Sequence, residues 1–129
     1  MPRAATDSRH SGAAAEAAAC EHLRQRGLAL VERNARFPFG EIDLVMREGG
    51  TLAFVEVRFR RSDAFGGAAV SVNAGKRRRI ALAAQAWLTA NPPLAKLACR
   101  FDVVAVTPDR DDRLRCEWIP SAFTLDDLA

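Results

Sequence analysis

The chain has 129 residues, of which 49% are hydrophobic and 27% charged, and this composition is typical of one soluble domain with a hydrophobic core. Its net charge of +3 is too small to identify a partner by itself. No apolar run reaches the about 18–20 residues that cross a bilayer, and residues 1–11 lack an apolar signal segment, which argues against a membrane or secreted protein. We expect one domain at 11–120, between a disordered leader at 1–10 and a polar tail at 121–129.

The first predicted element is a helix over residues 13–26. Ser11 is a suitable N-cap and Gly27 a suitable C-terminal stop. The segment is rich in alanine, and a face of small side chains lets a helix approach a sheet closely. Glu16 lies in this stretch, where the residues alone favour a simple interaction between an acid and the helix dipole.

Three strands follow, and the second and third form a β-hairpin. They are expected at residues 28–36, 41–48 and 51–60. Gly49 and Gly50, between the last two, supply the positive φ angles of a two-residue type I′ turn. That turn pairs Glu48 with Thr51, and every later pair follows from this register. Directly opposed side chains point to the same face of the sheet.

The register of this hairpin places two acids side by side. Asp43 falls opposite Glu56, and Glu41 falls opposite Arg58. Opposed like charges destabilise a sheet, so a bound cation, a shared proton or a basic neighbour is needed to explain them. Arg58 follows Glu56 by two residues and therefore points to the same face. Two carboxylates beside a cation can hold Mg²⁺ or Mn²⁺ against a phosphate.

A second helix is expected at residues 74–90, after a loop over 61–75 that is either a functional cover or a plain surface loop. Asn73 is a suitable cap, and apolar residues at helical spacing form a core face. Basic side chains in the first turns oppose the helix dipole unless an anion binds there. Clustered cations indicate a polyanionic partner, with a solvated basic face as the alternative. The candidate nucleic-acid-binding residues are Arg60, Arg61, Lys76, Arg77, Arg78 and Arg79.

Two further strands complete the predicted domain. They are expected at 99–107, covered on both faces, and at 114–119, on an edge of the sheet. Asp102 is expected to form an ion pair with Arg100. A helix between the third and fourth strands implies a right-handed parallel crossover, so the order αβββαββ predicts an α/β fold with a mixed sheet flanked by helices.

Cysteine and histidine usage excludes several kinds of site. Cys20, Cys99 and Cys116 are scattered and form no Cys-x-x-Cys pair, so neither a disulfide framework nor a zinc site is indicated. This usage fits a reducing cytoplasm. His10 and His22 are the only histidines, and neither lies in a recognisable nucleophile–base arrangement.

Asp43 and the run Glu56-Val57-Arg58 resemble the PD-(D/E)xK nuclease signature. A wider set of matches resembles the bacterial YraN family, which is predicted to be similar to archaeal Holliday-junction resolvases. These matches are residues 40–44, 54–58, Lys76 and residues 100–104. The resemblance covers about residues 12–120 and implies a restriction-endonuclease-like core.

The resemblance also implies a metal-dependent endonuclease acting on DNA, with branched DNA as a possible substrate. Asp43, Glu56 and the Val57 carbonyl would bind Mg²⁺ or Mn²⁺, and Glu16 matches a proposed active-site position on the first helix. The signature lysine is Arg58 here, and arginine does not give up a proton, so its expected role is charge stabilisation, helped by Lys76. Resolvases act as dimers, which makes a homodimer possible, although the sequence shows no dimer surface.

Two other functions fit the same residues. The first is a non-catalytic nucleic-acid-binding protein that keeps the fold without turnover, and Arg58 is the feature that supports it. The second is a small interaction module in which the acid pair is only structural. A phosphate-binding protein would lose affinity steeply as the salt concentration rises, whereas an interaction module would not.

Overall fold

The computed structural model describes residues 11–61 and 72–124, and its elements follow the order predicted from the sequence. The helices are α2 (Gly12–Gln25) and α3 (Ala74–Ala90), and a short 3₁₀ helix, η2 (Pro92–Leu94), follows α3. The strands are β1 (Ala29–Phe37), β2 (Gly40–Glu48), β3 (Thr51–Phe59), β4 (Ala98–Pro108) and β5 (Leu114–Phe123). The predicted leader at 1–10, most of the predicted loop (62–71) and residues 125–129 lie outside the described residues.

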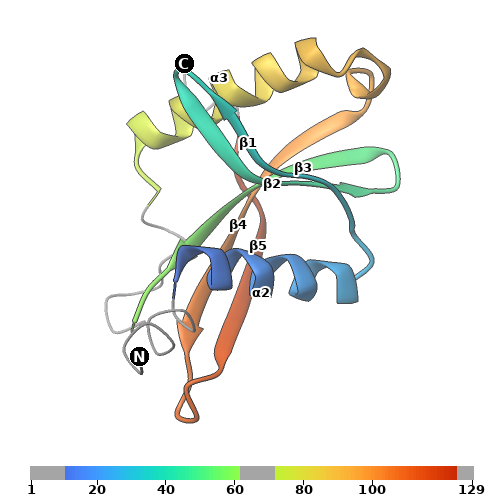
Figure 1. Cartoon of the computed structure of the whole chain (residues 1–129). Coiled ribbons are helices and arrows are strands. Elements are labelled where there is room, and N and C mark those ends of the chain that lie inside the picture. The colour runs from blue at the N-terminus through green and yellow to red at the C-terminus, as the bar shows by residue number, and fades with distance from the viewer. Residues whose placement is uncertain (1–10, 62–71, 125–129) are drawn as a thin grey trace.

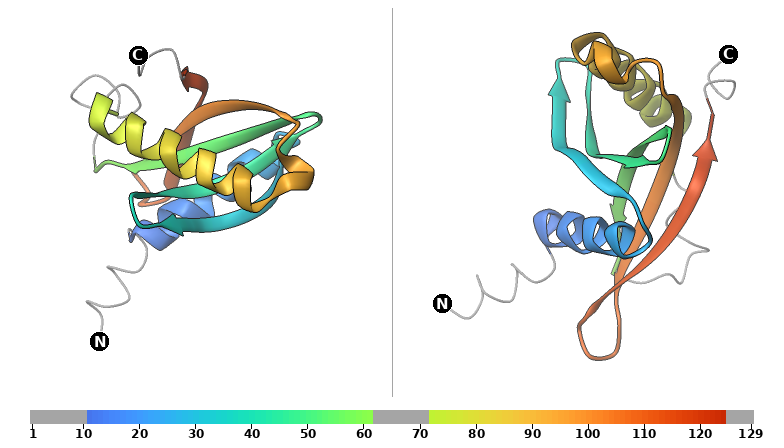
Figure 2. Two further views of the ribbon diagram at one scale, coloured as in Figure 1. Left: turned by 90° about the horizontal axis from the view of Figure 1, so that it is seen from above. Right: turned by 90° about the vertical axis from the view of Figure 1, so that its right-hand side faces the viewer.

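The strands form one five-stranded sheet in the order β1-β2-β3-β4-β5. Only β3 and β4 are parallel, and the other neighbours are antiparallel. Figure 1 shows α2 and α3 on opposite sides of this sheet, and Figure 2 shows the turn between β4 and β5 projecting beyond both helices. The predicted α/β class and mixed sheet are confirmed. None of the helices in the described part of the chain has the length and apolarity needed to cross a membrane.

Helix α2 covers one face of the sheet with small side chains. Its buried residues are Ala15, Ala19, Cys20 and Leu23, and they pack against buried residues of β2, β3 and β4. The predicted cap is confirmed, because the Ser11 hydroxyl accepts a hydrogen bond of 3.1 Å from the Ala14 amide. Glu16, on the same helix, lies near the strands, because its side chain forms a hydrogen bond with Asn34 of β1.

Helix α3 covers the other face. Ile80, Ala83, Ala84 and Trp87 are buried, as the helical spacing predicts, whereas Leu88 is only partly buried. The Trp87 ring meets Phe54 edge-on, with 5.9 Å between centroids, and its Nε1 donates a hydrogen bond of 2.9 Å to Glu32. Asn73 caps the helix, since its side chain accepts from the Lys76 amide at 2.9 Å.

The start of β2 lies unusually close to α3. A Cβ atom at Gly40 would lie 2.8 Å from the carbonyl oxygen of Arg79, which is closer than real Cβ atoms approach backbone. Glycine is therefore required for α3 to contact the sheet with its first turns. This contact places the N-terminal end of α3 beside the β2–β3 hairpin.

The hairpin has the predicted register but a different turn. Glu48 pairs with Thr51, and the pairing continues to Leu44 with Val55. Only Gly49 has a positive φ, of 59°, and this is the pattern of a type II′ turn, whereas the predicted type I′ turn needs positive φ at both central residues. Both types match the twist of the flanking strands, and two glycines can adopt either one.

Strand β5 extends to Phe123, beyond the end predicted at residue 119. Residues 121–123 therefore belong to the sheet and not to the expected polar tail. Ser121 has a φ of 52° and lies in a break of the β4–β5 register. Because of this break, the end of the strand does not show a simple alternation of polar and apolar residues. The Phe123 ring stacks on Phe101 with 4.9 Å between centroids.

The buried carboxylate of Asp102 holds this irregular strand in place. It accepts hydrogen bonds from Arg100 Nε at 3.1 Å, from Trp118 Nε1 at 3.0 Å and from the Ser121 amide at 2.9 Å. The ion pair predicted between Asp102 and Arg100 is confirmed. Asp102 is fully buried, so the structure depends on these partners to offset the cost of removing its charge from water.

We expect Asp102→Ala to lower the free energy of unfolding by about 3 kcal/mol, because it leaves Arg100 Nε, the Trp118 indole and the Ser121 amide without their acceptor. Urea denaturation followed by circular dichroism measures this change. Glu117→Ala, at an exposed position of β5, is the control and should stay within about 0.5 kcal/mol of the wild type. Equal losses in the two variants would show that the Asp102 contacts do not stabilise β5.

Candidate active site

Asp43 and Glu56 lie where β2 and β3 separate. The backbone pairing ends at Leu44 and Val55, one step before the two acids. Beyond this point the Asp43 carboxylate accepts a hydrogen bond of 2.8 Å from the Val57 amide, so a side chain replaces the next backbone bond of the ladder. The acids are almost buried, with 8% of Asp43 and 5% of Glu56 exposed.

The two carboxyl groups interact directly, although they do not form a regular cross-strand pair. Burial raises the pKa of Asp43 to about 7, and the negative charge of Glu56 and a hydrogen bond that protonated Asp43 donates to it act in the same direction, against the bond from Val57. Near neutral pH the pair therefore holds a proton that an exposed aspartate would have lost. A cation bound between the carboxylate oxygens would stabilise the ionised form of this pair.

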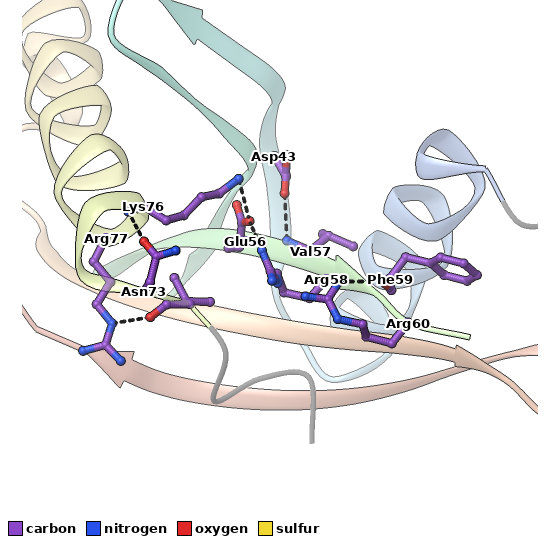
Figure 3. Close-up of polar contacts among 10 residues, drawn as sticks. Asp43, Glu56, Val57, Arg58, Phe59, Arg60, Asn73, Lys76 and Arg77 are labelled. Carbon is purple, nitrogen blue, oxygen red and sulfur yellow. Dashed lines mark hydrogen bonds and ion pairs between the residues drawn. The ribbon is translucent and has the colours of Figure 1, made fainter. Parts of the chain in front are cut away.

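Two cations reach Glu56 from different elements. Lys76 Nζ, from the first turn of α3, lies 3.2 Å from Glu56 Oε2, and Arg58 Nη1, from β3 itself, lies 3.8 Å from the same oxygen. Figure 3 shows both side chains directed at Glu56, with Asp43 on the neighbouring strand. The structure thus brings together the acid pair and both cations that the sequence singled out.

Glu16 adds a third acid from α2. Burial raises its pKa, a hydrogen bond from Asn34 opposes this change, and the charges of Glu41 and Glu56 raise it further. The charge of Glu16 also raises the pKa of Asp43, so acids from three elements interact electrostatically. Within residues 11–61 and 72–124, however, no group of three or more His, Cys, Asp or Glu side chains is close enough to hold a metal ion. Asp43 and Glu56 share a hydrogen bond, whereas Glu16 acts on them through its charge.

Asn34 is a site residue that sequence analysis missed. It lies opposite Asp43, between the pairs Arg33–Leu44 and Ala35–Ile42, and its φ of 52° interrupts the β1–β2 ladder there. Its side chain also bonds Glu16. The available signal was an asparagine inside a strand, since asparagine is depleted in strands and tolerates the left-handed region.

We expect Asn34→Ala to destabilise the protein by about 1–2 kcal/mol, because alanine pays the cost of a left-handed backbone. Asn34→Gly should cost less than the alanine variant, since glycine adopts positive φ freely. Urea denaturation of the two variants gives the comparison. If alanine is tolerated as well as glycine, the backbone conformation at this position is not a source of strain.

The predicted pairing of Glu41 with Arg58 is wrong. Glu41 forms an exposed ion pair with Arg36 on β1, with 3.3 Å between Nε and Oε2. The β2–β3 ladder ends before these two residues would meet, so Arg58 turns to Glu56 on its own strand. The register that the turn defines therefore holds only as far as Leu44 and Val55, because the regular pairing ends at Asp43.

The remaining basic residues differ in their surroundings. Arg77 Nε donates a hydrogen bond of 2.8 Å to the Val72 carbonyl, and its guanidinium lies over the Phe123 ring at 5.5 Å. Figure 3 shows Arg77 pointing away from Asp43. Arg60 donates to the carbonyl of Phe59, at the end of β3. Arg61, Arg78 and Arg79 are exposed.

Known proteins resemble this chain over most of its length. The model of the family described as "Uncharacterised protein family UPF0102" matches residues 15–106. A UPF0102 protein of Xanthomonas campestris pv. campestris (strain B100) is 54% identical over 116 residues, covering 90% of this chain and 93% of the relative. A UPF0102 protein of Yersinia pseudotuberculosis serotype O:1b (strain IP 31758) is 47% identical over 119 residues, covering 92% and 97%. The chain therefore belongs to family UPF0102, the YraN family that its sequence resembles.

Proposed function

We propose that this protein is a metal-dependent endonuclease that hydrolyses phosphodiester bonds in DNA. The observation that carries the proposal is the buried pair of Asp43 and Glu56, placed where β2 and β3 separate and flanked by Lys76 and Arg58. Two acids that share a proton, next to two cations, form a group that can bind a metal ion and a phosphate together.

The donor set fits Mg²⁺ or Mn²⁺. Both are hard cations that prefer oxygen ligands and keep several waters, so two carboxylates with a backbone carbonyl, for which Val57 is the candidate, are sufficient protein ligands. When bound, the ion supplies Lewis-acid polarisation and a water of lowered pKa. Asp43 and Glu56 hold the ion, and Glu16 orients a water or joins the ligand shell from α2.

The cations of the site act on the substrate. A positive side chain near Glu56 stabilises the charge that develops on the phosphoryl oxygens during hydrolysis. Arg60, Arg61 and the basic residues of α3 hold flanking phosphates, with exposed Arg78 and Arg79 the most accessible. By the family resemblance, the substrate is branched DNA and the acting form a homodimer. All three cysteines are free, which agrees with a reducing cytoplasm.

The alternative is a nucleic-acid-binding protein without turnover. Arg58 favours it, because arginine at the signature's lysine position carries charge but shuttles no proton. This protein would bind DNA through the same basic residues, with an affinity that falls steeply as salt rises.

A cleavage screen separates the two functions. Single-stranded, duplex, flap and four-way DNA are incubated with the protein in Mg²⁺ or in Mn²⁺. Asp43→Asn is the matched control, because asparagine still offers an oxygen to the Val57 amide, whereas alanine would leave that buried N–H without a partner. Cleavage by the wild type alone supports the nuclease. Salt-sensitive DNA binding without cleavage in either metal supports the alternative.

A further inference from the structure

Glu56 has two cationic neighbours that differ in how they are held. Both reach the same oxygen, Lys76 at 3.2 Å and Arg58 at 3.8 Å. The Lys76 side chain is 38% exposed, and that of Arg58 is 19% exposed. The lysine is therefore both closer to the carboxylate and more accessible to a molecule arriving from solvent.

The first turn of α3 presents Lys76 from a fixed position. The Asn73 side chain accepts from the Lys76 amide, and the Arg77 side chain is bound to the Val72 carbonyl and to the Phe123 ring. The close approach of Gly40 to Arg79 holds the same turns against β2. A functional group carried on such a fixed element is placed more accurately than one on a loop.

We propose that Lys76, and not Arg58, is the cation that contacts the scissile phosphate, and that Arg58 serves to hold Glu56 in place. The inference rests on the proposed nuclease function. In the metal-free protein the ammonium of Lys76 occupies Glu56 Oε2. With a divalent cation held by Glu56, the Lys76 ammonium would be released from that oxygen and would donate hydrogen bonds to a phosphoryl oxygen of the substrate. Lys76 exchanges no proton in this step.

The charges of the site agree with this exchange. Glu16, Asp43 and Glu56 supply three acids, and Arg58 and Lys76 supply two cations, so the ionised site lacks positive charge. A divalent ion changes this excess of one negative charge into an excess of one positive charge, which suits a singly charged phosphodiester. Lys76 is then the cation free to move, because its flexible stem carries a compact charge, whereas the planar guanidinium of Arg58 is less exposed.

Steady-state cleavage of the best DNA substrate tests the assignment. Lys76→Met should lower kcat by about 100-fold with little change in KM, as expected for loss of a group that stabilises the transition state. Arg58→Lys placed in the Lys76→Met background should restore at least about tenfold of kcat, because it returns an ammonium to the site from β3. Lys96→Met removes an exposed lysine outside the site, between η2 and β4, and is the matched control. A Lys76→Met variant that changes KM alone, or a double variant without recovery, overturns the proposal.

Titration calorimetry with Mn²⁺ and no DNA gives a readout that needs no activity. If the Lys76 ammonium competes with metal at Glu56, Lys76→Met should tighten Mn²⁺ binding by at least about threefold, and Lys96→Met should leave it unchanged. An unchanged affinity in Lys76→Met overturns the proposal. A wild type that binds Mn²⁺ but cuts no DNA refutes the nuclease function, and the titration still decides whether Lys76 holds the Glu56 oxygen.

Discussion

Glu56→Gln is expected to lower Mn²⁺ affinity and DNA cleavage by more than about 100-fold. Removing a residue that only contacts a metal ligand already lowers metal affinity or activity by about 10–100-fold, and Glu56 is itself a proposed ligand. Glutamine keeps the size of the side chain but removes the charge that attracts a divalent cation. Glu56 is 5% exposed and contacts two cations, so its carboxylate is the electrostatic centre of the site. Titration calorimetry and a cleavage assay on the same preparation measure both losses.

Glu41→Gln is the matched control for this experiment. Glu41 lies on β2, two residues before Asp43, but it is exposed and paired with Arg36. Its removal should leave Mn²⁺ affinity within about twofold of the wild type, because an exposed charge is screened by solvent. Circular dichroism shows whether Glu56→Gln remains folded. Equal effects of the two variants would mean that the protein attracts Mn²⁺ through its general surface charge, and the proposed metal site would be abandoned.

Local chemistry explains why much of this structure was predictable. Ser11 and Asn73 cap the two helices through bonds to residues three positions away, so each cap depends only on its own segment. The pair Gly49-Gly50 sets the hairpin register through a single turn. These short-range features were enough to bring Asp43 and Glu56 to the same region of the sheet.

Long-range contacts account for the parts that were missed. The hairpin register breaks where Asp43 bonds Val57, and the neighbouring ladder breaks at Asn34. Neither interruption can be predicted from a turn type or from sequence periodicity, because each depends on how two strands meet in three dimensions. Strand β5 continues past residue 119 since Asp102, far away in the sequence, binds the amide of Ser121. A rule based on alternating polar and apolar residues detects only the end of that pattern near residue 119.

The contact between Lys76 and Glu56 shows the limit of sequence reasoning for the site itself. Lys76 lies on α3 one turn before the buried Ile80, so helical spacing alone indicates that it is on the side of the helix that faces the sheet. The distance of 3.2 Å to Glu56 also depends on the close approach of α3 at Gly40, which no periodicity reveals. The sequence could therefore nominate Lys76, but only the packing of α3 against β2 gives it a specific partner.

The stability of the protein is expected to fall between about pH 4 and pH 7 because of Asp43. Burial and the charge of Glu56 raise its pKa from 3.8 to about 7, so in this window the folded state binds a proton that the unfolded state has released. The stabilisation is complete below the unfolded pKa and is lost as the pH rises through the folded pKa. The shift corresponds to a loss of roughly 2–4 kcal/mol in the free energy of unfolding.

Asp43→Asn should remove this dependence while keeping the acceptor for the Val57 amide. The variant is expected to match the wild type near pH 4 and to be more stable by roughly 2–4 kcal/mol at pH 8. Urea denaturation across this range measures the difference between the two proteins, so that other titrating groups largely cancel. A difference that stays constant with pH would show that Asp43 ionises normally in the folded state.

Mn²⁺ then separates a metal site from an acid pair that is only structural. A bound cation offsets the repulsion between Asp43 and Glu56, so 1 mM Mn²⁺, on the order of a typical enzyme assay, should raise the melting temperature of the wild type at pH 8. The increase should shrink at pH 5, where protons compete for the same oxygens, and should be absent in Asp43→Asn. If the asparagine variant is stabilised at pH 8 but Mn²⁺ shifts neither protein, the pair weakens the fold without binding metal, and the interaction-module function becomes the better account of these residues.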